Sequence, residues 1–504
     1  MSSWNLNIAV GDFFLDFAWI GLLLYTATLL RTHLPFFQKH LLPANLIAGG
    51  IGLLIGMNGL GLIGLTTDRL GAYVYHLLAL LFIALALRTP QSKLGLSSVK
   101  TGMAFIITYL VQALVGLAIA FALIYTIMPN LFAGIGLLPP LAFGMNPGVA
   151  YTFGQNWEQF GFESGGVVGL TFAAAGFLVA YTVGIALVKR GIKKGEAAYL
   201  DRTFGYTCDR NCGSGPDPSS DSVQNSRSTT VPGSGSDTEK DYRTYSTTAS
   251  KPDARPSEAR AFGLTAGRIT TSPEIIESLS LHVGLVGLIY ILTYGILALL
   301  ELGLVAINAE HEIQTLWSFH FIAAAIIALF FRKGMDGMEA SGVIDDTTMT
   351  RLSNYFMDFM IVASVAAISI TVVLAYWLPL LLISVSVAIT TWWTVHSLMH
   401  SAFKKYRLER FASVFGNMTG TIQSGLLLLR ILDSGMKSPA SYNLVYGSGF
   451  ALILGFPVLV LVNVPVHYFD DPNLGYFVIM IAMLIYLLML LAGWKYLVNA
   501  GSRS

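Results

Sequence analysis

The sequence predicts an all-α polytopic membrane protein. Its 504 residues are 54% hydrophobic and 12% charged, whereas a soluble domain is about one-quarter charged. Its mean hydropathy is +0.64, and apolar runs of about 20 residues, the length of a spanning helix, recur along the chain. Each half contains one interrupted apolar stretch. We therefore expect two inverted five-helix repeats, each with a re-entrant hairpin, and one extra C-terminal span, about 11 spans in total.

The first repeat, residues 1–193, contains five predicted spans. They lie at about 13–30, 41–62, 70–87, 101–127 and 167–188. The interrupted stretch, about 130–165, contains glycine, proline, asparagine and glutamine too often for a spanning helix. Lipid cannot hydrogen-bond a broken backbone, so such a stretch at membrane depth must be buried in protein or line a wet cavity. We expect a re-entrant hairpin here.

Residues 194–271 are rich in serine, threonine, proline, glycine and aspartate, which predicts a disordered cytoplasmic linker. Both cysteines, Cys208 and Cys212, lie in this linker. Their spacing, with no further ligands nearby, is only a weak metal signal, so no metal site is predicted.

The second repeat, residues 272–465, again contains five predicted spans. They lie at about 275–305, 317–331, 354–375, 378–403 and 442–464. The second re-entrant hairpin is expected at about 405–440. Residues 466–504 contain the extra span, at about 474–498, and a cytoplasmic tail.

The distribution of basic residues predicts the orientation. The first thirty residues contain no lysine or arginine, so the N-terminus is expected outside the membrane and the C-terminus inside. The basic residues that then fall inside are Arg31, Lys39, Arg88, Lys93, Lys100, Lys189–Lys194, Arg332, Lys333, Lys404, Lys405, Arg407, Arg410, Lys495 and Arg503. Because five spans precede the linker, the second repeat begins on the opposite side from the first.

The two interrupted stretches share a sequence frame. Phe143-Gly144-x-x-Pro147-Gly148 in the first corresponds to Phe415-Gly416-x-x-Thr419-Gly420 in the second. Two further segments match in the same order: Arg69–His76 with Arg351–Asp358, and Phe177–Gly184 with Phe456–Asn463. Interrupted segments at corresponding places in two halves are typical of a secondary transporter's binding site.

The tips of the two hairpins are the candidate binding site. Half-helix N-termini present free N–H groups to an anion, and freed carbonyls with Thr or Asn oxygens can hold a hard cation. The predicted substrate-binding residues are Asn146, Pro147, Gly148, Asn417, Thr419, Gly420, Thr421, Gln423 and Asn463. The predicted ion-coupling residues are Gly144, Met145, Gly416, Met418, Thr182 and Asp358. The alternative is that these polar groups only cap the broken helices.

Three ionisable residues lie in or beside the predicted spans. Arg430 follows the second tip and would either neutralise a substrate carboxylate or pair with Asp433 or extend to the inner interface. Asp358 and His76 lie at corresponding positions of paired spans and are candidates for proton coupling, because ionisable groups inside a membrane are usually functional.

The chain resembles the bacterial sodium–glutamate symporter family over nearly all its length outside the linker and the last span. The matching motifs of the first half are Leu42-Pro43-Ala44-x-x-Ile47-Ala48-Gly49-Gly50, Gly144-x-x-x-Gly148-x-Ala150-Tyr151, Trp157-Glu158-x-Phe160-Gly161-Phe162 and Gly169-Leu170-Thr171-x-Ala173-Ala174. Those of the second half are Phe415-Gly416, Thr419-Gly420-Thr421, Gly425-Leu426, Leu429-Arg430 and Asp433. The family's first re-entrant motif is Gly-Gly-His-Gly-Thr-Gly, where this chain reads Phe143-Gly144-Met145-Asn146-Pro147-Gly148. The resemblance implies a homodimer in the bacterial inner membrane, with scaffold domains and moving transport domains.

We therefore expect an elevator-type symporter for a small organic anion, glutamate or a related acidic amino acid or dicarboxylate, coupled to sodium. A proton-coupled transporter of another carboxylate and a channel-like or non-transporting protein of the same fold remain open. The expected partners are the anionic substrate, sodium or a proton, the lipid bilayer and a second copy of the chain. A net charge of +1 gives no reason to expect a nucleic acid. No cofactor is predicted, and no enzyme activity, since no nucleophile–base pair occurs within the spans.

Overall fold

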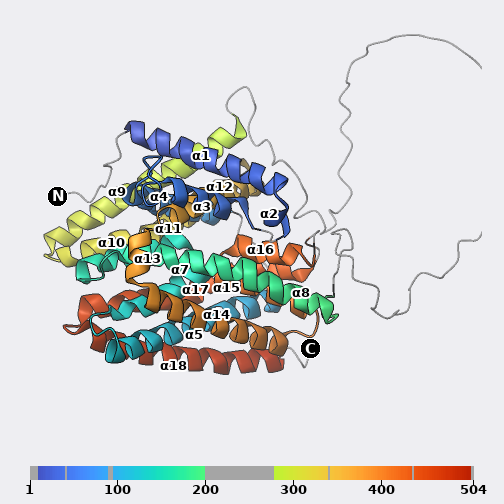
Figure 1. The fold of residues 1–504 in the computed structure, drawn as a ribbon. Helices are drawn as coiled ribbons and strands as arrows, with labels where there is room; N and C mark the ends of the chain where they lie inside the picture. Colours follow the sequence, from blue (N-terminus) through green and yellow to red (C-terminus); the bar gives the residue numbers. More distant parts are fainter. Residues whose placement is uncertain are drawn as a thin grey trace, which may run out of the picture. The chain divides into compact units, whose positions relative to one another are not determined.

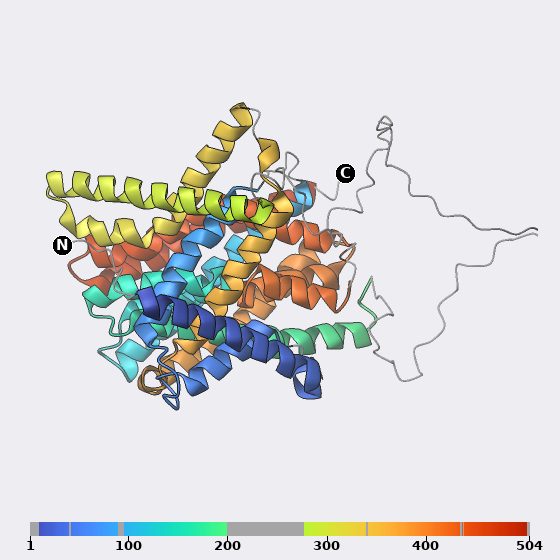
Figure 2. The ribbon, with the colours of Figure 1, turned by 90° about the horizontal axis from the view of Figure 1, so that it is seen from above.

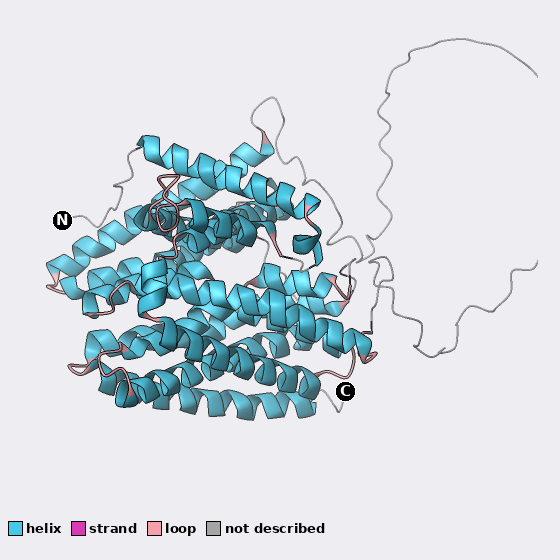
Figure 3. Cartoon of the chain, viewed as in Figure 1, coloured by secondary structure: helices cyan, strands magenta, loops and turns pink. Residues whose placement is uncertain are grey.

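The computed structural model describes residues 10–39, 42–88, 95–198, 277–338, 341–433, 436 and 438–500. Within these ranges the chain is helical and contains no strand (Figure 3). Seven described helices are long and apolar enough to cross a membrane, and a bent one would be an eighth. The seven lie where seven of the spans were predicted. The all-α class is confirmed, and the apolar helices are compatible with a polytopic membrane protein. Most of the predicted linker, with both cysteines, lies outside the described residues.

The first half contains eight α-helices and four shorter 3₁₀ or π segments among the described residues. The α-helices are α1 (Val10–His33), α2 (Pro35–Lys39), α3 (Ala44–Ile55), α4 (Thr67–Ala86), α5 (Leu96–Thr126), α6 (Pro147–Asn156), α7 (Gly165–Val179) and α8 (Ile185–Lys193). The shorter segments are η1 (Ala133–Leu137), η2 (Pro140–Met145), η3 (Trp157–Phe160) and η4 (Ala180–Gly184). Together, α7, η4 and α8 form one apolar helix long enough to span.

The second half contains ten α-helices among the described residues. They are α9 (Ser278–Ala306), α10 (Ile313–Ser318), α11 (His320–Gly337), α12 (Asp346–Ala366), α13 (Ile370–Ala375), α14 (Trp377–Ala402), α15 (Arg407–Thr419), α16 (Ile422–Arg430), α17 (Pro439–Tyr468) and α18 (Pro472–Ala500). Two 3₁₀ turns, η6 (Glu310–Glu312) and η7 (Ser341–Val343), connect some of them. Helix α17, which contains Pro457 and Pro465, is bent by 49°.

The predicted span at 41–62 is a shorter helix in the structure. Helix α3 has 12 residues and ends at Ile55, whereas crossing a bilayer needs about 20. The chain then folds back, since Leu60 N–H donates to Leu54 O at 2.8 Å and Leu62 N–H to Ile55 O at 2.9 Å. Gly61 has a φ of +65°, a conformation that favours glycine. The glycine-rich sequence, which reads as part of an apolar span, therefore forms a tight loop.

Four pairs of helices pack in a reciprocal pattern between the two halves (Figures 1 and 2). Helix α4 packs on α12, and α5 packs on α14. Helix α3 of the first half packs on α12 of the second, just as α11 of the second half packs on α4 of the first. Within the halves, α1 packs on α3 and α9 packs on α11. Glycines allow the α3–α12 approach, because a Cβ added at Gly49 would lie 2.6 Å from the Cβ of Val365. Exchanging the halves would exchange these contacts.

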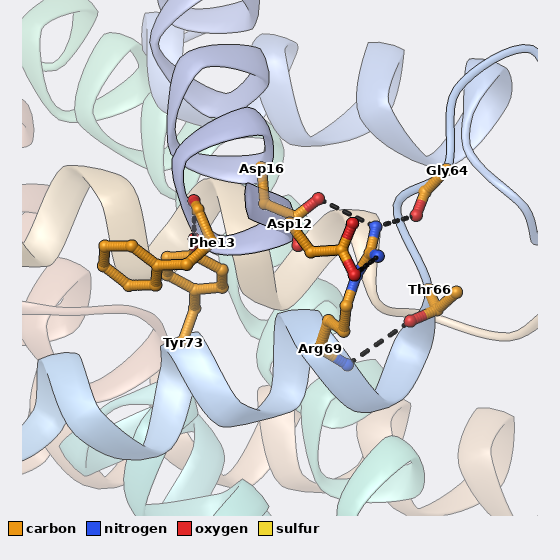
Figure 4. Close-up of polar contacts among 7 residues, drawn as sticks. All are labelled: Asp12, Phe13, Asp16, Gly64, Thr66, Arg69 and Tyr73. Atoms are coloured by element: carbon orange, nitrogen blue, oxygen red, sulfur yellow. Dashed lines mark hydrogen bonds and ion pairs between the residues drawn. The ribbon is translucent and has the colours of Figure 1, made fainter. Parts of the chain in front are cut away.

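An ion-pair cluster joins α1 to α4 (Figure 4). Arg69, in the first turn of α4, pairs with Asp12 at 3.3 Å and with Asp16 at 2.9 Å, both on α1. Asp16 is only 1% exposed, while the Arg69 side chain is 24% exposed, so the acid is buried and its partner is partly buried. Arg69 also donates to the Gly64 carbonyl, and Tyr73 donates to the Phe13 carbonyl. A buried pair of this kind is costly to break, because one unpaired charge would remain.

Large apolar side chains cover the outer faces of α1, α9 and α18. Examples are Phe14 at 65% exposure, Leu299 at 69% and Leu488 at 58%. Continuous apolar surfaces of this kind are rare on soluble monomers and suit contact with lipid. They support the membrane character that the composition predicts.

Candidate substrate and ion site at two broken helices

The first broken helix turns at Asn146. The π segment η2 ends at Met145, and Asn146 adopts an extended conformation, with φ −172° and ψ 165°, before α6 begins at Pro147. Proline disfavours the helical conformation of the residue before it, which explains why the break lies at Asn146. The Asn146 side chain accepts a hydrogen bond from the Val149 N–H at 3.0 Å. Asn146 therefore caps the helix that it begins.

The second broken helix turns at Gly420 and Thr421. Helix α15 ends at Thr419, Gly420 has φ −156° and ψ −103°, and Thr421 is extended before α16 begins at Ile422. Thr419 donates to the Phe415 carbonyl at 2.8 Å, within its own helix. Thr421 occupies the N-cap position of α16, yet its side chain makes no capping hydrogen bond. In the shared frame Asn146 aligns with Met418, so the second break lies two to three residues later than the first.

One face of α5 holds both breaks. Tyr109 Oη donates to the Gly144 carbonyl at 2.6 Å, just before the first break. Gln112 Nε2 donates to the Met418 carbonyl at 2.9 Å, just before the second, and lies 2.9 Å from Thr391 Oγ1 on α14. Residues three apart on a helix lie on the same face. The same face of α5 therefore binds a carbonyl oxygen beside each break, that of Gly144 at the first and that of Met418 at the second.

Helix α7 packs against both breaks at Gly176. A Cβ added at Gly176 would lie 2.6 Å from the Thr419 carbonyl oxygen and 3.0 Å from the Phe143 ring. The next residue, Phe177, lies 3.2 Å from a Cβ added at Gly420. Only a residue without a side chain lets α7 approach the two turns this closely.

Two buried polar groups near the breaks have unused hydrogen-bonding atoms within the part of the chain that the structure describes. Thr421 Oγ1 and Gln112 Oε1 are fully buried and have no partner among these residues. Asn417, two residues before the end of α15, is 4% exposed. A buried polar atom without a partner costs about 1–3 kcal/mol, so such groups in a native protein require an explanation. A hydroxyl group and an amide oxygen are suitable for a small polar ligand.

Several predicted glycines contact protein atoms closely. A Cβ added at Gly144 would lie 2.0 Å from the Tyr109 ring, and one at Gly148 would lie 2.9 Å from Leu78 on α4. Gly416 faces Gly425 at the crossing of α15 and α16, where an added Cβ would lie 2.8 Å from the Gly425 Cα. In the structure these glycines permit close helix packing around the tips.

Other predicted residues lie apart from the tips. Asn463 on α17 accepts a hydrogen bond at 2.9 Å from Trp157 Nε1, and Trp157 lies eleven residues beyond the first break at Asn146. Thr182 is exposed and bonds to the Leu178 carbonyl of its own helix. Gln423 lies 3.3 Å from Asn354 on α12. Of the predicted set, the segments 144–148 and 416–421 meet on α5, whereas Asn463 and Thr182 do not join them.

The two candidates for proton coupling have separate environments. Asp358, half-buried on α12, accepts a hydrogen bond from Asn45 on α3 at 2.8 Å. His76 on α4 lies 2.6 Å from Tyr290 Oη and 3.1 Å from Tyr294 Oη, both on α9. Among the described residues, no three His, Cys, Asp or Glu side chains are grouped as they would be to hold a metal ion.

Tyr109, Gln112 and Gly176 complete the site and were not predicted from the sequence. Gln112 is a polar residue in the middle of an apolar run, and that signal could have identified it, because intramembrane polar groups usually bond across helices. Tyr109 and Gly176 give no comparable signal. Comparison with protein-family models, curated proteins and solved structures gave no significant match.

Proposed function

We propose that the protein is a secondary active transporter of a small organic anion, glutamate or a related acidic amino acid or dicarboxylate, in symport with sodium. One observation carries the proposal: two broken helices are bound to one face of α5 by Tyr109 and Gln112, next to buried polar atoms that lack partners. Broken helices around unsatisfied polar groups suit a ligand site within an otherwise apolar protein.

The two ligands would use different groups of the site. The anion would bind the free N–H groups at the start of α16 and the Thr421 hydroxyl, because a helix N-terminus favours negative charge. Sodium would bind oxygen atoms, for which the Gln112 and Asn417 amides are suitable. Neutral oxygen ligands match a monovalent cation that must be released again on the other side.

The transport cycle would use the two halves as inverted repeats with re-entrant hairpins. The reciprocal packing of α3 on α12 and of α11 on α4 supports this arrangement. We propose that the protein lies in the bacterial inner membrane with its N-terminus on the outer side. A second copy of the chain would cover part of the apolar outer faces, and an elevator motion would carry the tips across.

Uptake of labelled L-glutamate into proteoliposomes, with and without an inward sodium gradient, tests the proposal. We expect accumulation above the equilibrium level only with the gradient, and its loss when a sodium ionophore is added. Protein-free liposomes prepared in parallel measure leakage. If well-folded protein accumulates neither glutamate, aspartate nor a dicarboxylate under any cation gradient, the proposal is wrong.

A proton-coupled carrier is the second candidate. The contact of Asp358 with Asn45 and the contact of His76 with two tyrosines each place a titratable group inside the helical bundle. Replacing the sodium gradient with a proton gradient in the same assay separates the two candidates. If protons drive transport, Asp358→Asn should abolish proton-driven uptake.

A further inference from the structure

The two broken helices differ in how each meets a long helix of its own half. Helix α6, which follows the first break, packs on α4, and α16, which follows the second, contacts α12. By the shared sequence frames, Tyr151 of α6 corresponds to Gln423 of α16, and residues 71–72 of α4 correspond to residues 353–354 of α12. The α4–α6 crossing and the α12–α16 crossing are therefore corresponding places in the two halves.

The α4–α6 crossing is closed by an aromatic ring. A Cβ added at Gly71 would lie 2.5 Å from the Tyr151 Cζ atom, so the ring rests directly on the backbone of α4. Gly71 is buried, and Tyr151 is only 6% exposed. Nearby, a Cβ added at Gly148 would lie 2.9 Å from Leu78. Carbon atoms packed this closely leave no room for water at the crossing.

The α12–α16 crossing is made by polar side chains instead. Gln423 Nε2, in the first turn of α16, donates to Asn354 Oδ1 on α12 at 3.3 Å. Asn354 is exposed, and Gln423 is half-buried. Asp358 lies on the same face of α12, four residues further on, and is also half-buried. We call these three residues the α12–α16 seam.

The exposed part of the seam suits contact with water rather than lipid. Lipid offers no hydrogen-bonding partner, so polar side chains within an apolar bundle face one another or a water-filled space. Gln423 is two residues from Thr421, whose buried hydroxyl has no partner among the described residues. The seam therefore connects an exposed side chain, Asn354, to the second break.

The seam lies toward the side on which the second broken helix begins and ends. Lys404 and Lys405 are exposed just before α15, and the exposed Arg430 ends α16. Basic loops are found on the inner side of a membrane, so the proposed orientation places both ends of this hairpin inside. Helix α16, which contains Gln423, runs from the second break toward that side.

We propose that water reaches the second break from the inner side of the membrane through the α12–α16 seam, while the α4–α6 crossing closes the first break from the outer side. The inference rests on the proposed function for its meaning, since only a carrier requires access from one side at a time. In the opposite state of a carrier built from inverted repeats, the two crossings would exchange. Helix α16 would then pack on α12, and Tyr151 would leave Gly71.

Thiol labelling of the full-length protein tests this access. Cys208 and Cys212, the two cysteines of the chain, are replaced with serine, and a single cysteine is introduced as Asn354→Cys or Gln423→Cys. A membrane-impermeant maleimide is added to right-side-out and to inverted membrane vesicles. Both cysteines should react at least about tenfold faster in inverted vesicles, because a thiol shielded from water is inert to such a reagent.

Three further single cysteines are the controls. Lys405→Cys and Glu310→Cys, both at exposed positions, report the inner and the outer side. Thr152→Cys, next to Tyr151 and 3% exposed, is the matched buried position on α6 and should react from neither side. Asn354→Cys changes an exposed residue and provides the test if Gln423→Cys does not fold.

The labelling pattern decides the inference without any substrate. No reaction at either seam position, reaction only in right-side-out vesicles, or reaction of Thr152→Cys as fast as that of Gln423→Cys would overturn it. Absence of glutamate uptake would contradict the proposed function and leave the labelling result unchanged. A seam that does not react would leave the uptake result unchanged, so the two failures are distinguishable.

Discussion

The two breaks differ in how their polar groups are satisfied. At the first, the Asn146 side chain caps α6 through the Val149 N–H. At the second, the Thr421 hydroxyl is buried without a partner and α16 has no side-chain cap. Both turns are otherwise held alike, by a side chain of α5 on a carbonyl oxygen. The Asn146 side chain at the first turn is therefore satisfied within the protein, whereas the Thr421 hydroxyl at the second turn is available to bind a ligand.

Gly176 should show the largest effect, because it contacts both turns. In Gly176→Val the new side chain would collide with the Thr419 carbonyl, 2.6 Å from the Cβ position, and with Phe143. We expect little folded protein, measured by size-exclusion chromatography after membrane extraction. The matched control is Gly295→Val on α9, where no atom lies within 4 Å of the Cβ position. Equal yields of the two variants would contradict the close packing of α7 on the breaks.

Gln112→Ala should have the next largest effect, at the second break. It removes the donor to the Met418 carbonyl and the contact with Thr391, and leaves both groups buried. Leaving a buried group without its partner costs about 1–3 kcal/mol each, so we expect a lower free energy of unfolding and loss of uptake. Denaturant titration and the proteoliposome assay measure the two. Gln112→Met, an uncharged side chain of similar length, separates shape from donor capacity, because it keeps most of the volume and removes the donor.

Asn146→Ala tests the first break. Loss of an N-cap side chain costs about 1 kcal/mol, so the free energy of unfolding should fall by that amount while substrate affinity stays within about twofold. Asn146→Asp, which keeps the capping oxygen, should restore stability. A large fall in affinity with unchanged stability would show that Asn146 contacts the substrate, and the contrast between the breaks would be lost.

Thr421→Val should have the smallest effect on stability. It replaces an unpartnered hydroxyl with a methyl group of nearly the same volume, so the free energy of unfolding should not fall. Substrate affinity should fall about tenfold or more, as expected when a hydrogen bond to a charged ligand is lost. Thr394→Val, on α14 and also buried without a partner, is the control. Unchanged uptake in Thr421→Val would remove the second break from the proposed site.

The local sequence identified where both helices break, but not which residues of other helices hold the two turns in place. Pro147 fixes the first break through its steric effect on Asn146. The second has no proline, and the shared frame placed its turn two to three residues early, because α15 continues through Met418 and Thr419 until Gly420. Asn463 ends a segment that matches Phe177–Gly184 by its sequence offset and was predicted to bind substrate with the tips, yet it accepts a hydrogen bond from Trp157 at the far end of α6. A sequence offset does not give the depth at which two helices cross.

The sequence by itself determined that the chain is a helical membrane protein and that two of its apolar stretches are interrupted, because composition and proline sterics act locally. Tertiary structure alone decided that Tyr109 and Gln112 hold both interruptions on one face of α5. These contacts join residues from 35 to 306 positions apart. Helix packing sets which residues meet over such separations, and a pattern read along one helix does not contain that information.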